Sequence, residues 1–189
     1  TNSFGGNALR LKLHEAEDRV AALNLVAARL ARAAADAAPR DVLVAGSIGP
    51  TGELFAPLGA LDMAQAEAVF AEQAEALAEG GVDLLQIETM SSLEEVEAAA
   101  NAGRATGLPV FATMTFDTAG RSMMGITPED YAGYARKLGL NGFGANCGIG
   151  PAELLHSVTG FGEGGKQMII AKGNCGIPQY LDGKIHYHG

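Results

Sequence analysis

Apolar residues in this chain follow two patterns that alternate along its length. One pattern consists of short continuous apolar runs, which are typical of strands buried on both faces of a parallel sheet. The other places apolar residues every three or four positions, as on one face of an amphipathic helix. The runs lie at residues 42–46, 82–87, 110–116, 142–146 and 167–173, and Thr1 stands at what reads as the end of a further strand.

Capping residues mark where the predicted helices begin. Asp62 and Thr127 have the side chains preferred at an N-cap. Pro151 suits the first turn of a helix, where its missing N–H costs nothing. Ser91 and Glu94 have the spacing of a capping box, so we expect a helix to follow them.

The apolar stripes of the first two long helices predict which residues face the core. The helix over about 15–38 ends before Pro39, and the chain from 174 to 189 reads as a glycine-rich polar loop. The stripe of the first helix comprises Val20, Leu23, Ala27, Leu30 and Ala34. The stripe of the second comprises Met63, Ala66, Phe70, Ala74 and Leu77.

Strands that alternate with helices predict an α/β fold with a parallel sheet. The strand–helix unit recurs after about 30 residues. We therefore expect a (β/α)8 TIM barrel, with a doubly wound sheet as the alternative. The units fit strands 2 to 7 of such a barrel, so residues 1–189 are expected to be a single barrel domain whose first and last units are missing.

The composition and net charge of the chain limit the classes of molecule that it is expected to bind. The chain has 189 residues, is 48% hydrophobic and carries a net charge of −9. An acidic surface disfavours nucleic acid and anionic membranes as partners. No apolar stretch approaches the roughly 20 residues that a membrane span needs, and two cysteines do not make a disulfide scaffold. We expect a protein of the reducing cytoplasm, with a homo-oligomer compatible with this composition.

Each predicted strand delivers polar residues at its carboxyl end. In a barrel these ends meet at one mouth, where such folds keep their chemistry. Glu88 is a candidate functional acid, although it could simply cap the next helix. Ser47 and Thr115 read as hydroxyls that satisfy loop backbone. The remaining candidates at these ends are Asn2, Ser3, Thr89, Asp117, Asn146, Cys147, Lys172 and Asn174.

Cys147 follows a strand and precedes a glycine turn and a helix. A single cysteine can be a buried hydrophobe, a metal ligand or a nucleophile. Cys147 and Cys175 do not form a CxxC pair, so their spacing carries no zinc signature. The residues alone leave these readings open.

Several short motifs, in order, resemble the homocysteine S-methyltransferase family. The family includes betaine–homocysteine methyltransferase and the homocysteine-binding module of cobalamin-dependent methionine synthase. The resemblance extends over essentially the whole chain. The motifs are Thr1-Asn2-Ser3-Phe4, Gly46-Ser47-Ile48-Gly49-Pro50, Ile87-Glu88-Thr89, Thr115-Phe116-Asp117 and Gly144-Ala145-Asn146-Cys147-Gly148.

This resemblance implies a barrel enzyme with a catalytic zinc ion held by three cysteines. Cys147 is similar to the first of them, while the adjacent Cys-Cys pair that supplies the others is absent from these residues. Glu88 resembles the acid that binds the homocysteine amino group, and Asn146 a residue beside the metal. Thr1 and Asn2 resemble the strand end that lines the substrate pocket.

The implied reaction belongs to methionine biosynthesis. Zinc with sulfur ligands would bind homocysteine as a thiolate, since a free thiol with a pKa of about 8.5 is mostly protonated at neutral pH. A methyl group would then pass to that sulfur and give methionine. The donor stays open among a betaine-type compound, S-methylmethionine and a methyl-corrinoid.

Two other readings compete with this one. Lys172 at a strand end could be the nucleophile of a Schiff-base lyase on the same barrel. Alternatively, a barrel fragment without the Cys-Cys pair could be non-catalytic.

Overall fold

The computed structural model describes residues 1–162, 165–176 and 178–187. Its main sheet has five parallel strands in the order β1-β2-β3-β4-β5. These strands are β1 (Ala45–Ile48), β2 (Leu84–Met90), β3 (Val110–Met114), β4 (Gly142–Cys147) and β5 (Met168–Gly173). The helices are α1 (Ala8–Leu11), α2 (Val20–Asp36), α3 (Met63–Glu79), α4 (Leu93–Ala105), α5 (Pro128–Leu138) and α6 (Pro151–Gly160), with short 3-10 turns η1 (Lys12–His14) and η2 (Glu17–Arg19).

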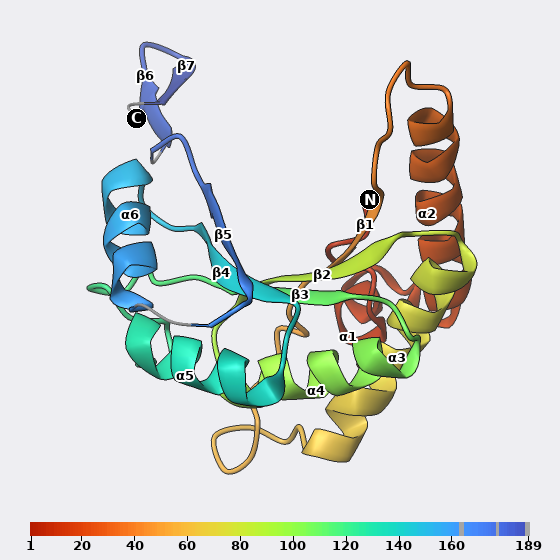
Figure 1. Cartoon of the computed structure of the whole chain (residues 1–189), viewed down its shortest axis with the longest axis horizontal. Coiled ribbons are helices and arrows are strands. Elements are labelled where there is room, and N and C mark those ends of the chain that lie inside the picture. Colours follow the sequence, from red (N-terminus) through yellow and green to blue (C-terminus); the bar gives the residue numbers. More distant parts are fainter. Residues whose placement is uncertain (163–164, 177, 188–189) are drawn as a thin grey trace.

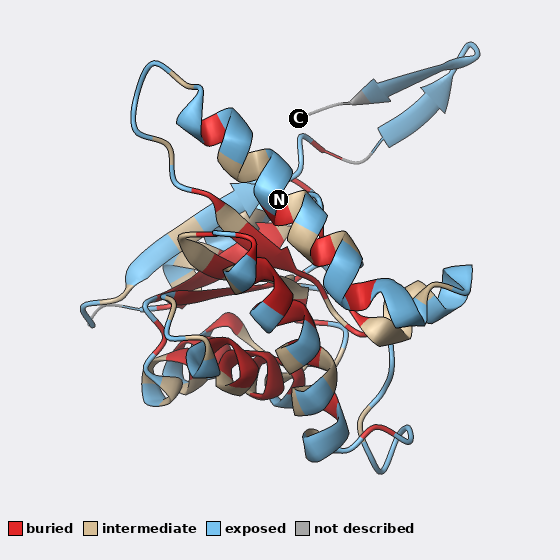
Figure 2. Ribbon diagram, turned by 90° about the vertical axis from the view of Figure 1, so that its right-hand side faces the viewer, coloured by how far each residue is buried: buried red, intermediate tan, exposed pale blue. Residues whose placement is uncertain are grey.

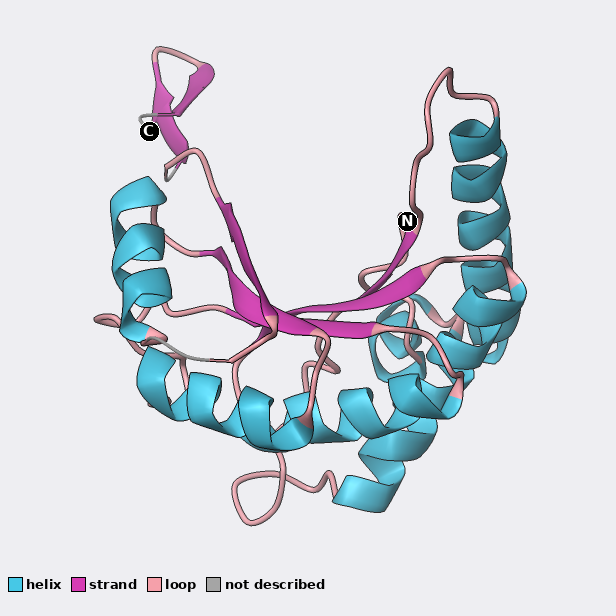
Figure 3. Cartoon of the chain, in the orientation of Figure 1, coloured by secondary structure: helices cyan, strands magenta, loops and turns pink. Residues whose placement is uncertain are grey.

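The sheet is curved, and the helices lie along its outer side. Figure 1 shows the strands on the inside of an arc, with α2 to α6 following one another around the outside. The same view coloured by secondary structure shows the two layers separately (Figure 3). Strand order equals chain order, without the reversal at which doubly wound sheets change direction. The expected α/β class with a parallel sheet is therefore confirmed.

The hydrophobic core lies between the sheet and these helices (Figure 2). Phe70 and Leu77 on α3 are fully buried, as the apolar stripe of this helix predicts. Tyr131 on α5 is also fully buried, and its hydroxyl donates a 2.7 Å hydrogen bond to the carbonyl of Ala112. The central strand β3 is buried at all five positions. The middle of the sheet is thus deeply buried.

Strand β2 shows how the sheet places polar groups on its inner face. Leu85 and Ile87 are fully buried, whereas Gln86 and Glu88 between and after them are half-buried. Because successive side chains of a strand point to opposite faces, the apolar pair faces the helices and the polar pair faces the inside of the arc. Glu88 therefore reaches the inner face at the carboxyl end of β2.

The apolar stripe predicted for the first helix is confirmed only in part, at the fully buried Val20. Leu30 is 68% exposed, whereas Asn24 and Ala28 are buried. The buried Nδ2 of Asn24 donates a 2.8 Å hydrogen bond to the carbonyl of Gly6. Gly80 lies close against Ala28, since a Cβ added to Gly80 would lie only 2.3 Å from the Cβ of Ala28. The inward face of α2 is therefore formed by a buried amide and a close contact with Gly80, and Leu30 lies outside it.

Several strand boundaries also differ from the sequence prediction: β2 covers 84–90 instead of 82–87, and β3 ends at Met114 instead of Phe116. The first strand begins at Ala45 instead of Val42, and Leu43 before it is 73% exposed. Thr1 is not in an assigned strand, but it runs beside β1. Its amino group donates to the carbonyl of Ala45 at 2.8 Å, and the N–H of Gly49 donates to the carbonyl of Phe4 at 2.9 Å.

The predicted helix starts are mostly confirmed. Asp62 and Gln65 form a capping box for α3, and the Thr127 side chain accepts from the N–H of Asp130 at the start of α5. The exception is α4, where the N-cap is Ser92 and not Ser91. Glu95, three residues after this cap, points elsewhere, as described below.

The expected loop after residue 174 contains a hairpin of β6 (Pro178–Leu181) and β7 (Lys184–Tyr187). Asp182 and Gly183 at its tip have φ angles of 49° and 75°. An Asp-Gly pair between two short strands favours this turn, because both central residues need positive φ. Positions 177 and 188–189 of the predicted loop lie outside the described residues.

Across the described part of the chain, no helix has both the length and the apolar character needed to cross a membrane.

Candidate functional site

The carboxyl ends of β1, β2 and β5 meet around the carboxylate of Glu88. Its Oε1 accepts a 2.5 Å hydrogen bond from the hydroxyl of Ser47 on β1. Its Oε2 accepts a 3.1 Å hydrogen bond from the ammonium of Lys172 on β5. Lys172 reaches Glu88 past two intervening strands, which is feasible only on the inner side of a strongly curved sheet. The Glu88 side chain is 13% exposed and that of Lys172 is 69% exposed, so an anchored acid lies beneath a solvated cation.

A break in the strand pairing lies at Glu88 and Thr89. The register between β2 and β3 shifts between Ile87 and Met90, so the two residues between them form an irregularity of the β-bulge type. Thr89 has φ of 64°, an uncommon value for a β-branched residue. Bulges re-aim side chains next to functional sites. Here the bulge turns Thr89 towards β4.

Asn146 joins this bulge to the thiol of Cys147. Its Oδ1 accepts from the N–H of Thr89 at 2.9 Å, and its Nδ2 donates to Thr89 Oγ1 at 2.6 Å and to Cys147 Sγ at 3.2 Å. The Asn146 side chain, which is buried, thereby crosses the end of β3 and ties β2 to β4. Three hydrogen bonds from one amide define the local geometry of the site.

Cys147 is the last residue of β4 and is half-buried. Its φ is 59° and that of Gly148 is 76°, so the chain turns sharply at the thiol. Asn174 holds the turn, because its N–H donates to the carbonyl of Cys147 at 3.2 Å and its Nδ2 donates to the carbonyl of Gly148 at 3.0 Å. The Sγ lies 3.6 Å from Thr89 Oγ1. The thiol is thus held by its neighbours and remains accessible.

Thr1 and Asn2 differ in their relation to the site. Thr1 Oγ1 accepts a 2.8 Å hydrogen bond from the N–H of Ser47. The hydroxyl of the same Ser47 donates to Glu88, so Thr1 contacts the residue that holds the acid. Asn2 is exposed, and within the described ranges its side chain has no hydrogen bond to the site. Glu88, Asn146, Cys147 and Thr1 are therefore brought to one mouth, whereas Asn2 is only near it in sequence.

The donor set for a metal is incomplete in the part of the chain that the structure covers. No group of three or more His, Cys, Asp or Glu side chains there could hold a metal ion. Cys147 is the one cysteine at the mouth, and Cys175 is exposed in the loop after β5. Cys147 could supply one sulfur ligand, whereas zinc takes four ligands in structural sites and three protein ligands in catalytic ones, so the described residues alone do not complete a zinc site.

A cavity of about 500 Å³ adjoins the mouth at Thr89. The Oγ1 of Thr115, which lines it, is buried without a hydrogen-bond partner among the described residues. Glu95 closes the cavity from α4 and is 4% exposed. Its Oε1 accepts from the N–H and hydroxyl of Thr51, at 2.8 and 2.6 Å. Burial raises the pKa of Glu95, and the two bonds from Thr51 lower it by less.

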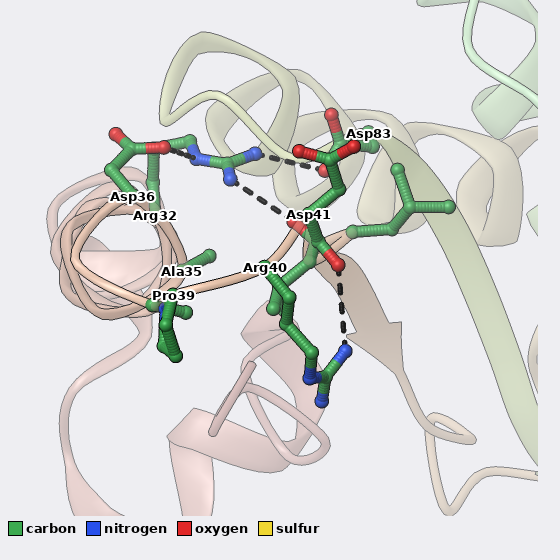
Figure 4. Close-up of a pocket in the computed structure, with 10 residues that line it drawn as sticks. Arg32, Ala35, Asp36, Pro39, Arg40, Asp41 and Asp83 are labelled. Carbon is green, nitrogen blue, oxygen red and sulfur yellow. Dashed lines mark hydrogen bonds and ion pairs between the residues drawn. The ribbon is translucent and has the colours of Figure 1, made fainter.

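A second cavity, of about 470 Å³, lies at the opposite end of the sheet, near the amino end of β1 (Figure 4). Arg32 donates there to Asp36 at 2.8 Å, to Asp83 at 2.9 Å and to the carbonyl of Val42 at 3.1 Å. Asp83 also accepts from the N–H of Val44 at 2.6 Å. These bonds join α2 to the entries of β1 and β2, so we assign this network to stability.

Two contacts at the mouth were not predicted from the sequence. Lys172 was considered only as a nucleophile, yet its ammonium is paired with Glu88. Thr89 was treated as part of a motif and not as a contact of the thiol. The adjacency of Thr89 to Glu88 was a visible signal, but the bulge that re-aims it depends on strand register, which a single sequence does not reveal.

Comparisons with known proteins identify the family of this chain. The family described as homocysteine S-methyltransferase matches residues 1–189. Methionine synthase from Mycobacterium tuberculosis is 30% identical over 94% of this chain and 16% of that protein. The one from Mycobacterium leprae is 28% identical over 94% of this chain and 15% of that protein. The chain thus spans about a sixth of the curated relatives it matches.

Two solved structures of the homocysteine methyltransferase MmuM from Escherichia coli resemble the fold. The oxidized form has a TM-score of 0.68 and 25% identity, covering 85% of this chain and 59% of that one. The metallated form has a TM-score of 0.70 and 24% identity, covering 84% of this chain and 62% of that one.

Proposed function

Since this chain belongs to the homocysteine S-methyltransferase family, we propose that it forms the homocysteine-binding part of a methyltransferase that makes methionine. We further propose that the curved sheet is part of a (β/α)8 barrel, with residues 1–189 as one domain. Support for the barrel comes from the sequential parallel strand order and from the Lys172–Glu88 pair across the inner face.

The observation that carries this proposal is the placement of an anchored acid and a thiol at one mouth. We assign Glu88 to the ammonium group of homocysteine, because its carboxylate is oriented by Ser47 and remains partly open. Thr1 supports it through Ser47. Asn146 and Thr89 position the thiol of Cys147. Asn2 is proposed as a lining residue on the resemblance of its motif alone.

The reaction forms an S–C bond and breaks two bonds, the methyl–donor bond and the S–H bond of homocysteine. The sulfur of homocysteine attacks the methyl carbon of the donor, and the electron pair of the methyl–donor bond stays with the donor. The thiol proton goes to solvent. The protein's contribution is to fix the amino-acid end at Glu88, so that the sulfur is presented in a defined position.

Zinc enters as a proposal about Cys147. A zinc ion with thiolate ligands would supply activation of the substrate thiol. We propose Cys147 as one of its ligands, with the remaining ligands outside the residues described by the structure. No step above depends on this ion.

The methyl donor can be identified directly. The protein at its full natural length is incubated with homocysteine and, separately, with betaine, S-methylmethionine or methylcobalamin, and methionine is detected by mass spectrometry. Methionine formed with one donor supports the proposal. No methionine with any of them, from a folded and metal-replete protein, would favour the non-catalytic reading.

The cysteines offer a matched pair of variants for the metal. Cys147→Ser should abolish zinc retention measured by elemental analysis, whereas Cys175→Ser should retain it. Equal zinc content in both variants would remove Cys147 from the metal site. The Schiff-base alternative has less support, because Lys172 is 69% exposed and ion-paired, whereas a nucleophilic lysine is usually desolvated.

A further inference from the structure

The ion pair between Lys172 and Glu88 is not explained by the methyl transfer itself. Glu88 is held from one side by Ser47 and is 13% exposed. Lys172 lies over the other oxygen at 3.1 Å with most of its side chain in solvent. The proposed function uses the acid for the substrate ammonium and gives the lysine no role.

Resting on that proposed function, we propose that Lys172 binds the α-carboxylate of homocysteine while Glu88 binds its α-ammonium. An α-amino acid carries both charges on substituents of one carbon atom. Groups that recognise both must therefore also be neighbours of opposite sign. The Lys172–Glu88 pair has this arrangement at the mouth that holds the thiol of Cys147.

The pair is built so that a substrate can share it. An ion pair with one partner this exposed contributes little to folding, so it opens at small cost. Lysine has three donors and a carboxylate has about four acceptor positions, so each group can keep its partner and still bind the ligand. Ser47 keeps Glu88 in place meanwhile. Glu88 is thus the fixed partner that receives the ammonium, and Lys172 is the exposed partner that turns to the carboxylate.

Charge complementarity points the same way. The chain has a net charge of −9, so its overall field disfavours an approaching carboxylate. An ammonium at the mouth offsets this locally. A thiol ligand with a free carboxylate should therefore depend on Lys172, whereas one without it should not.

The test compares homocysteine with 3-aminopropane-1-thiol, which lacks the carboxylate and keeps the amine and thiol. Binding of both to the metal-replete protein at its full natural length is measured by calorimetry, so no methyl donor is needed. Lys172→Met should weaken homocysteine binding roughly tenfold or more, as for a lost charged hydrogen bond, and leave the analogue unchanged. Lys172→Arg should retain most of the homocysteine affinity. Lys166→Met, which removes an exposed lysine elsewhere, is the control for net charge.

Two results would overturn this inference. Equal weakening of both ligands in Lys172→Met would mean that Lys172 only positions Glu88. Tighter homocysteine binding would mean that the lysine competes with the substrate ammonium. Either result leaves methionine formation by the wild-type protein intact, whereas failure of that reaction alone would refute the proposed function.

Discussion

The hydrogen bonds of Asn146 lead to a prediction about both stability and binding. Asn146→Ala removes the acceptor for the N–H of Thr89 and the donor to Thr89 Oγ1 and Cys147 Sγ. Without them, Thr89 is free to leave its φ of 64°. Glu88 is the preceding residue, so its carboxylate should lose its fixed position. We therefore expect weaker homocysteine binding together with a loss of stability.

The expected loss of stability follows from these bonds. A neutral hydrogen bond contributes about 1 kcal/mol net, and the bond to sulfur is weaker, so the three together amount to about 2–3 kcal/mol. Relaxation of Thr89 from its left-handed conformation returns about 1 kcal/mol. The free energy of unfolding should fall by about 1–2 kcal/mol. In a Thr89→Gly background the cost of Asn146→Ala should be smaller, because one bond is already gone.

Urea denaturation measures the stability, and calorimetry measures homocysteine binding. Asn141→Ala is a matched control, since Asn141 Oδ1 accepts from the N–H of Val110 at 2.9 Å at the other end of the sheet. This control should lose stability without losing affinity. If Asn146→Ala retained wild-type affinity, or changed the free energy of unfolding by less than about 0.5 kcal/mol, the value for an ordinary surface site, this account of Asn146 would be wrong.

Two further predictions concern charged groups away from the mouth. Arg32→Met should lower the free energy of unfolding by about 1–2 kcal/mol at low salt and by less at high salt, because its partners Asp36 and Asp83 are partly exposed. Urea titrations at the two salt concentrations measure this difference, and equal losses at both would contradict the prediction. Burial raises the pKa of Glu95 above its ordinary value of 4.5. As pH rises above 4.5, the unfolded state therefore releases this proton more readily than the folded state does. The free energy of unfolding should fall over this range of pH. Glu95→Gln should flatten this pH dependence, and an unchanged slope between urea midpoints at pH 5 and pH 8 would argue against it.

Much of the fold was predictable because its signals are local. Asp62 begins α3, Thr127 begins α5 and Pro151 begins α6, as their side chains favour. The errors arose where packing overrode local pattern. Leu30 is exposed because a buried Asn24 and a close approach at Ala28 determine which face of α2 is inward, and neither is visible in hydrophobic periodicity.

The sequence predicts which residues form the site, but not the hydrogen bonds and ion pairs between them. Strand ends identified Glu88, Asn146 and Cys147, because parallel sheets bring these ends together. The pairing of Lys172 with Glu88 depends on the curvature of the sheet, which residue patterns do not encode.

The strand order has a consequence for how the molecule holds together. Within the five-stranded sheet, every pair of neighbouring strands is also consecutive in the chain. Such an arrangement approaches a one-dimensional stack, in which units at the ends can open without the middle. Asn146 and Lys172 work against this, because each ties β2 to a strand that is not its neighbour. The residues of the mouth therefore also bring cooperativity to the sheet, and a mutation there should loosen the coupling between distant units as well as the site.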